Sequence, residues 1–230
     1  FTILLAIGSS LPLEKVILVG LAILTQQFSV GLSNDWLDFE RDKTVGRKDK
    51  PAARGEVTAN LVRNASFVSA VLALVFAASL GWVSGLMMLA MLVIGWSYNL
   101  GLKSTALSVA PYAIGFGVLP IFVTLSLEPS QVPHWWVMLA ASLLGISAHF
   151  ANALPDLIDD RETGVRALPH LLGQRVSALV IASATALASL LVVTQSRSLD
   201  EGFAWLGFTL TMAFAPVSYT HLRAHETVLD

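Results

Sequence analysis

Two polar segments interrupt an otherwise apolar chain, and their residue types suit metal and phosphate chemistry. Asparagine and aspartate recur at four-residue steps in each segment, at Asn34, Asp38 and Asp42 and, 118 positions later, at Asn152, Asp156 and Asp160. The same shift aligns a following glycine, proline and glycine, with basic residues between them. The match predicts an internal repeat. We call the two sets the first and the second ladder.

The spacing within each ladder predicts a shared helix face. Residues four apart lie along one stripe of an α-helix, and residues three apart lie beside it, so Asp35 and Asp159 border their stripes. Carboxylates crowded on a stripe repel one another unless a cation lies between them, and oxygen-rich clusters suit Mg²⁺ shared with a phosphate. The alternative is a pair of solvated helix ends at a membrane surface. The presence of two matched ladders favours a site.

The composition indicates a protein that lies in a lipid bilayer. Of the 230 residues, 55% are hydrophobic and only 13% are charged, which is too apolar for a soluble domain of this length. Continuous apolar runs of about 20 residues, enough to cross a bilayer core as helices, cover residues 14–37, 61–81, 83–100, 105–127, 133–153 and 171–194, with shorter pieces at 1–11 and 203–217. Continuous runs favour helices over a closed barrel. We therefore expect an all-α, polytopic transmembrane bundle.

Basic residues are unevenly distributed between the loops. Most of them follow the two ladders, whereas the opposite loops hold only Lys15 and Arg197. The positive-inside rule therefore predicts that both ladders lie at the cytoplasmic face, most naturally of a prokaryotic plasma membrane. Membrane topology alone is one explanation of these basic loops. The other is contact with a bound phosphate, for which the candidates are Lys48, Lys50, Arg54, Arg161 and Arg166.

The chain ends and the cysteine count set limits on the interpretation. We expect one transmembrane domain over residues 1–217 that is incomplete at both ends, because the chain opens on Phe1 within an apolar run and its last apolar run breaks off in mid-span before residue 218. We interpret residues 218–230 as a non-native tail without a chemical role; a cytoplasmic loop is the alternative. The sequence contains no cysteine, which excludes disulfides, thiolate metal sites and cysteine nucleophiles.

Acidic and basic residues together favour a diphosphate bridged by Mg²⁺ over a simple divalent ion. An apolar bundle interior beneath such a site suits a hydrocarbon tail, and an isoprenyl diphosphate combines both features. Metal binding turns the diphosphate into a good leaving group, and the face of an aromatic ring stabilises an allylic cation. The candidate rings are Tyr98, Trp96, Phe116 and Phe122, and of these we favour Tyr98.

His149 lies on the stripe of the second ladder, deeper in the apolar run. An ionisable residue inside a membrane span is a functional candidate, either in contact with the acceptor or as a base. A hydrogen bond that packs two helices is the other interpretation.

Several motifs resemble those of the UbiA-type intramembrane prenyltransferases. They are Asn34-Asp35-x-x-Asp38-x-x-x-Asp42, Lys50-Pro51-x-x-x-Gly55, Tyr98-Asn99-x-x-Leu102-Lys103, and the second ladder leading into Gly164-Val165-Arg166-Ala167-Leu168-Pro169. The resemblance covers nearly all of residues 13–173. It implies a nine-helix bundle, of which this chain holds the larger part, and Mg²⁺-dependent transfer of a prenyl group from its diphosphate to an acceptor.

The resemblance also implies roles for the matching residues. One edge of the Mg²⁺–diphosphate would be bound by Asn34, Asp35, Asp38 and Asp42, and the other by Asp156, Asp159 and Asp160. Tyr98 and Lys103 would contact the diphosphate or shield the reacting carbon, so we expect catalysis to depend on them together with Asp38 and Asp156. Asn152 stands where an aspartate is usual and would orient the site without holding metal. Lys50 stands where arginine is frequent, which keeps the charge and loses the bidentate fork.

Three other functions are alternatives to prenyl transfer. A terpene cyclase on the same fold differs only in whether an acceptor intercepts the cation, and sequence does not separate the two. An ion- or proton-coupled transporter would place its acids near the bilayer midplane, whereas these lie where apolar runs end. The Asp-Gly-x-x-Ala-Arg motif of CDP-alcohol phosphotransferases is absent. We expect a small lipophilic or aromatic acceptor such as a quinone precursor, and neither a nucleic acid nor a protein partner.

Overall fold

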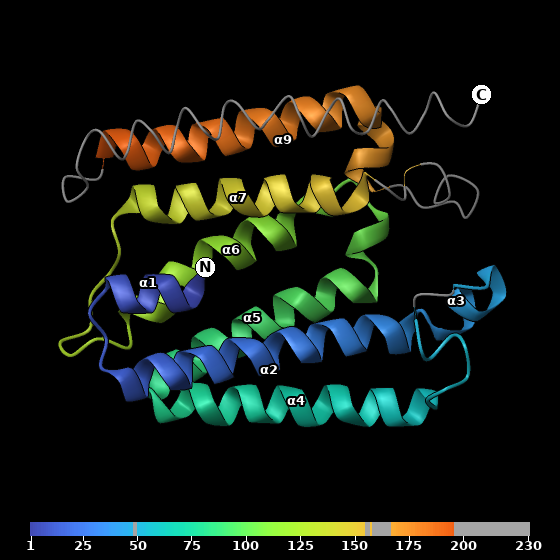
Figure 1. Cartoon of the computed structure of the whole chain (residues 1–230), viewed down its shortest axis with the longest axis horizontal. Coiled ribbons are helices and arrows are strands. Elements are labelled where there is room, and N and C mark those ends of the chain that lie inside the picture. The colour runs from blue at the N-terminus through green and yellow to red at the C-terminus, as the bar shows by residue number, and fades with distance from the viewer. Residues whose placement is uncertain (48–49, 155–156, 158–166, 196–230) are drawn as a thin grey trace. The chain divides into compact units, whose positions relative to one another are not determined.

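The computed structural model describes residues 1–47, 50–154, 157 and 167–195. All regular elements within these residues are helices, which confirms the expected all-α fold (Figure 1). The chain divides into two compact units. The first comprises residues 1–103 and 118–133, and the second comprises residues 104–117 and 134–230.

The first unit is built on three long helices. Its elements are α1 (Thr2–Gly8), α2 (Leu13–Leu37), α3 (Phe39–Val45), α4 (Ala59–Ser79), α5 (Trp82–Leu100) and the 3-10 turn η1 (Leu102–Ser104). Helices α2, α4 and α5 pack against one another in pairs, side by side in Figure 1. The Thr58 hydroxyl oxygen accepts the N–H of Leu61 (3.2 Å) and so begins α4. Helix α3 ends at Gly46, whose φ of 73° is one that glycine adopts without strain.

The second unit contains α7 (Trp135–Ala153) and α9 (Leu168–Gln195), which pack along each other. Helix α6 (Val109–Thr124) begins in the second unit and ends in the first. A Cβ added at Gly145 of α7 would collide with the backbone oxygen of Tyr112 and the side chain of Phe116. Glycine at this position therefore lets α7 lie close to the beginning of α6. Helix α9 is kinked at Gly173.

Within the described residues, five helices are long and apolar enough to cross a membrane, namely α2, α4, α5, α7 and α9. They coincide with five of the six predicted runs to within a few residues. The sixth run, 105–127, was predicted too long: it contains α6, a helix of only 16 residues. The polar stretch before Val109 forms turns instead of helix. Helix α1 has seven residues, and the predicted piece 203–217 and tail 218–230 lie outside the described residues.

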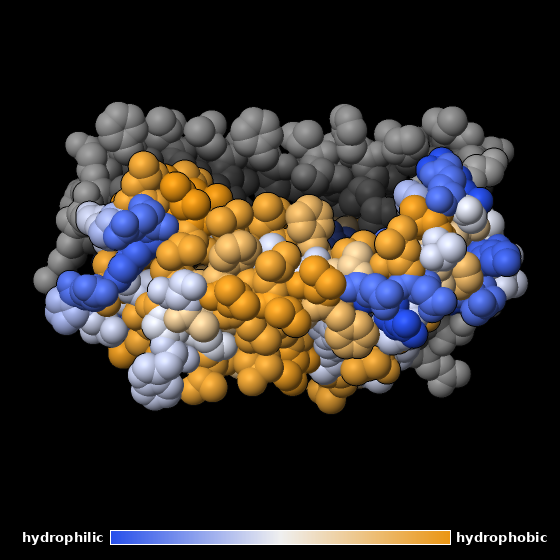
Figure 2. Space-filling model, turned by 90° about the horizontal axis from the view of Figure 1, so that it is seen from below, coloured by the Kyte–Doolittle hydropathy of each residue, from blue (hydrophilic) through white to orange (hydrophobic). Residues whose placement is uncertain are grey.

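The surface of the first unit has the polarity of a membrane protein. Figure 2 shows a broad band of hydrophobic side chains with hydrophilic residues gathered at both ends of the band. Large apolar side chains on α2 and α4 are exposed, among them Leu24, Phe28, Val68 and Val75. A continuous apolar surface of this kind is unfavourable in water and suited to lipid tails.

Small and polar residues join the helices of the first unit. Ser29, Ser33 and Ser66 are fully buried, and the Ser66 hydroxyl donates to the Ser29 carbonyl (2.9 Å), which joins α4 to α2. The Trp96 indole N–H donates to Ser29 Oγ (3.1 Å), and its ring lies 5.0 Å from that of Phe67, centroid to centroid. Such residues let helix backbones approach and bond across an apolar interface. The contacts of Trp96 are those of a packing residue.

We expect Gly95→Ala to destabilise the contact between α5 and α2. A Cβ at this position would lie 2.5 Å from Val30 Cγ2, and the stiff χ1 angle of valine prevents an easy adjustment. Overpacking of this kind costs about 1–3 kcal/mol, which should lower the midpoint of thermal unfolding in detergent. The control is Gly31→Ala, where nothing lies within 4 Å of the added Cβ and the midpoint should hold or rise. Equal midpoints would contradict the proposed contact.

Candidate functional site

The first ladder lies where α2 ends. Asp38 caps α2 and begins α3, with φ −90° and ψ 1°, so the expected single helix is broken at this residue. The four-residue register nevertheless continues through the break: the N–H of Asp38 donates to the carbonyl of Asn34 (2.9 Å), and the N–H of Asp42 donates to that of Asp38 (2.8 Å). The predicted spacing is therefore kept, although a bend replaces the continuous helix.

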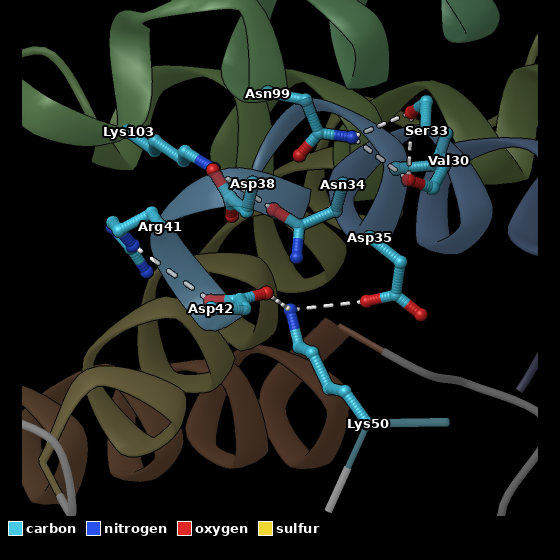
Figure 3. Close-up of polar contacts among 10 residues, drawn as sticks. All are labelled: Val30, Ser33, Asn34, Asp35, Asp38, Arg41, Asp42, Lys50, Asn99 and Lys103. Carbon is cyan, nitrogen blue, oxygen red and sulfur yellow. Dashed lines mark hydrogen bonds and ion pairs between the residues drawn. The ribbon is translucent and has the colours of Figure 1, made fainter. Parts of the chain in front are cut away.

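Lys103 joins the end of α5 to the first ladder. Its Nζ donates to Asn34 Oδ1 (3.0 Å) and to Asp38 Oδ2 (2.5 Å) (Figure 3). The side chains of Lys103 and Asp38 are only 16% and 12% exposed, so water screens the attraction between these two charges less than it screens a surface pair. The structure thus brings together three residues that the sequence predicted for the site.

Lys50 makes the second ionic contact of the ladder. Its Nζ lies 2.7 Å from Asp42 Oδ2 and 3.0 Å from Asp35 Oδ1, and Asp42 is 3% exposed. Arg41 Nε is farther away, 3.8 Å from Asp42 Oδ1. In Figure 3 the Lys50 amine points between the two carboxylates. Two lysines therefore neutralise most of the charge of three aspartates, a pairing that the sequence did not predict.

The two carboxylates decide the pKa of Lys50. Burial of the amine acts to lower this pKa, but the hydrogen bonds and charges of Asp42 and Asp35 outweigh burial, and the net pKa is raised from 10.5. Lys50 is therefore charged at neutral pH. The stability that it contributes is fully present below pH 10.5 and is lost as the pH rises through the raised pKa.

Asn99 is a buried site residue to which the sequence analysis assigned no role. Its amide nitrogen donates to the Val30 carbonyl (2.7 Å) and to Ser33 Oγ (2.7 Å), which uses both hydrogens of the amide (Figure 3). These bonds join α5 to α2 one residue before Asn34. They fix the position of α5 along α2, and with it the point at which Lys103 contacts the first ladder. The sequence feature that could have pointed to Asn99 is its polar amide within an apolar run.

The other predicted residues are half-buried, exposed or outside the described part of the chain. Tyr98 is half-buried on α5 beside Asn99. Arg54 pairs with Glu56 (2.9 Å), and both side chains are exposed, so its predicted phosphate contact remains a prediction. Six predicted site residues lie outside the described part of the chain: Lys48, Asp156, Asp159, Asp160, Arg161 and Arg166. The roles predicted for them, and the expected meeting of the two ladders, stay predictions.

The second unit holds His149 and Asn152 against the beginning of α6. His149 is 1% exposed, and its Nε2 lies 3.0 Å from Ser108 Oγ. Its ring centroid lies 5.0 Å from that of Tyr112. The Asn152 amide donates to the Tyr112 hydroxyl (3.3 Å). Both predicted residues thus contact α6 or the residue before it, and Ser108 and Tyr112 are residues that sequence reasoning missed.

We expect Lys50→Met to destabilise the protein by about 1–3 kcal/mol, because buried Asp42 keeps its carboxylate and loses its shortest ionic contact. Thermal unfolding in detergent near neutral pH measures this loss. Adding Asp42→Asn to Lys50→Met should recover part of it, since the unpaired charge is removed. The matched control, Arg54→Met, breaks an exposed pair and should change little. A loss in the control as large as that in Lys50→Met would refute the buried pairing.

The chain is similar in sequence to proteins of one family. The UbiA prenyltransferase family matches residues 1–228. Digeranylgeranylglyceryl phosphate synthase of Pyrococcus horikoshii is 26% identical over 174 residues, which cover 74% of this chain and 61% of that protein. The bacteriochlorophyll synthase 33 kDa chain of Cereibacter sphaeroides is 28% identical over 199 residues, which cover 80% of this chain and 64% of that protein. The chain thus spans less than two thirds of the length of these relatives.

Solved structures share the fold. A UbiA homolog from Aeropyrum pernix K1 matches with a TM-score of 0.80 and 17% identity over 96% of this chain and 86% of that one. A UbiA homolog from Archaeoglobus fulgidus, bound to DMAPP and Mg²⁺, matches with a TM-score of 0.74 and 20% identity over 97% and 83%. With five apolar helices of membrane-spanning length, the protein is an integral membrane protein. Since the family match extends over nearly the whole chain, the protein belongs to the UbiA prenyltransferase family.

Proposed function

We propose that this protein transfers a prenyl group from an isoprenyl diphosphate to a small lipophilic or aromatic acceptor, in a Mg²⁺-dependent reaction within the membrane. The observation that carries the proposal is the convergence of Lys103 on Asn34 and Asp38 where apolar α2 ends. Amide and carboxylate oxygens beside ammonium groups provide for both a divalent cation and a phosphate. The placement at a helix end suits a polar head group whose tail lies among the helices.

The oxygen donors of the first ladder fit Mg²⁺. Mg²⁺ is commonly held by one or two carboxylates together with substrate phosphates, rather than by a cage of protein ligands alone. Within the part of the chain that the structure describes, no three Asp, Glu, His or Cys side chains form such a cage. The oxygens of Asn34 and Asp38 are already directed at one cationic group, the Lys103 amine. Bound there, Mg²⁺ would neutralise charge on the departing diphosphate.

The lysines provide the remaining positive charge. In this proposal Lys103 and Lys50 contact phosphate oxygens that the metal leaves free, and Asp35, Asp38 and Asp42 hold the metal. Tyr98 on α5 presents an aromatic ring to the allylic cation. Asn99, which fastens α5 to α2, keeps Lys103 in register with the ladder. The repeat in the sequence assigns the same metal-binding role to Asp156, Asp159 and Asp160.

Similar proteins support the donor and leave the acceptor open. Structures of a UbiA homolog from Archaeoglobus fulgidus have been solved with DMAPP and Mg²⁺ and with GPP and Mg²⁺. The Pyrococcus horikoshii and Cereibacter sphaeroides relatives are named for different products. The proposal therefore names the donor class and the reaction, with the acceptor given only by its lipophilic character.

Asp38→Asn is expected to lower Mg²⁺-dependent diphosphate release from geranyl diphosphate by about 100-fold or more, because a neutral amide binds Mg²⁺ weakly and stabilises less charge in the transition state. Asp156→Asn should have an effect of the same order. Released diphosphate is measured with purified protein in lipid vesicles across a range of Mg²⁺ concentrations.

The matched control for both variants is Glu40→Gln, which neutralises an exposed acid on α3 and should keep near wild-type activity. Circular dichroism and monodisperse elution would establish that each variant is folded. Full activity in folded Asp38→Asn would remove the metal-binding role of the first ladder.

We also propose that the ladders face the cytoplasm of a prokaryotic cell, on the basis of the basic loops that follow them. The chain has no cysteine, so single cysteines report topology directly. With a membrane-impermeant maleimide on intact spheroplasts, Ser130→Cys, in the exposed loop after α6, should be labelled. Glu56→Cys, in the loop after the first ladder, should be labelled only after lysis. The reverse pattern would contradict the proposed orientation.

A further inference from the structure

Ser108, directly before α6, contacts the chain on both sides of the second ladder. The Ser108 side chain is fully buried. Its Oγ accepts the backbone N–H of Leu168 at the beginning of α9 (3.0 Å), and it lies 3.0 Å from His149 Nε2 near the end of α7. The second ladder lies between these two contacts in sequence. One hydroxyl therefore touches the chain before and after that ladder.

The hydrogen bonds of Ser108 decide where His149 carries its proton. A serine hydroxyl has one hydrogen to donate, and the bond from Leu168 leaves that hydrogen unused. Among the described residues, His149 Nε2 is the remaining hydrogen-bond partner of the Ser108 side chain. The His149 Nδ1 atom is buried and makes no hydrogen bond among the described residues in either tautomer, so the two tautomers differ at Ser108 Oγ. A hydrogen on Nε2 would place two donors against Oγ and leave the buried hydroxyl hydrogen unsatisfied as well, which is costly. His149 Nε2 is therefore the acceptor, and Nδ1 carries the proton.

We propose that Ser108 and His149 hold the two flanks of the second ladder in position. We call their hydrogen bonds to each other and to Leu168 the clamp. The inference rests on the proposed function, because it is through that ladder that the clamp would act on the reaction. Since the lone pair of His149 Nε2 receives the Ser108 hydroxyl, it is not available to take a proton from an acceptor. Of the functions considered for His149, the geometry argues against a base and favours the hydrogen bond that packs α7 against the start of α6; contact with the acceptor stays a prediction.

Further contacts in the second unit agree with a clamp. Tyr112, four residues after Ser108 and so on the same face of α6, accepts the amide of Asn152. Leu154 before Asp156, Leu157 within the ladder and Ala167 after it are all buried. Loss of either Ser108 contact would loosen the attachment of one flank to the start of α6. Small displacements of groups that bind a reacting centre are expensive in rate.

The protonation state is tested in the full chain by ¹⁵N NMR with labelled histidine, using His149→Gln to assign the signal. The expected spectrum shows a neutral ring with hydrogen on Nδ1 and a bare Nε2. Hydrogen on Nε2 would overturn the clamp. Hydrogen exchange provides a second measurement: the Leu168 amide should exchange about tenfold faster in Ser108→Ala than in wild type. Unchanged exchange in a folded variant would also overturn it.

Kinetics separate a positioning residue from a base. Ser108→Ala and His149→Leu should each lower kcat for diphosphate release by about tenfold or more with little change in KM. The double variant should be no worse than Ser108→Ala, because all three variants lack the bond between Ser108 and His149 and Ser108→Ala already lacks the Leu168 bond as well. His149→Gln keeps an acceptor oxygen and should lose less than about threefold. The control Ser183→Ala removes an exposed hydroxyl that bonds only within α9 and should match wild type.

The outcomes distinguish the clamp from the function on which it rests. Equal loss in His149→Gln and His149→Leu, or additive losses in the double variant, would refute positioning. An inactive wild-type protein would refute the proposed function, and NMR and hydrogen exchange would then still decide whether the clamp exists. Wild-type rates in folded Ser108→Ala would show that the bond has no part in the reaction.

Discussion

The pairing of buried carboxylates with lysines at the end of α2 is the constraint on which the first unit depends. An ionised group shielded from water is costly unless an opposite charge and hydrogen bonds compensate it. Asp42 is 3% exposed and Asp38 12% exposed, and each has a lysine amine within hydrogen-bonding distance. Those amines come from the loop after α3 and from the turn after α5. The acids therefore determine where two separate parts of the chain must lie.

The helix interfaces of the first unit serve that pairing. Lys103 reaches Asp38 only if α5 lies close to α2 in one register, and Asn99 fixes that register with two hydrogen bonds to Val30 and Ser33. Gly95 allows the approach because any side chain there would meet Val30. In water, hydrophobic burial drives helices together. In a membrane it does not, because lipid tails cover apolar surface as well as another helix does, so close packing and hydrogen bonds must hold the helices together. Packing and site geometry are thus set by the same few residues.

More of the fold than of the site could be predicted from the sequence. Continuous apolar runs located five long helices, because a bilayer demands length and polarity from each span. The run containing α6 was overestimated, since polar residues before Val109 form turns. Four-residue spacing placed Asn34, Asp38 and Asp42 correctly in register and missed the bend at Asp38. The lysine–aspartate pairs, Asn99 and Ser108 depend on helix contacts that periodicity does not encode.

Charge balance links the pairing to the proposed function. Asp35, Asp38 and Asp42 with Lys50 and Lys103 comprise three carboxylates and two ammonium groups, which leaves one net negative charge. A divalent cation that enters this cluster must share the carboxylate oxygens that now accept from the lysines. A diphosphate compensates for that competition, because its oxygens can receive the displaced amines. Metal and diphosphate would then each bind more tightly in the presence of the other. This coupling follows because one cluster contains both the carboxylates that bind the metal and the amines that bind the diphosphate.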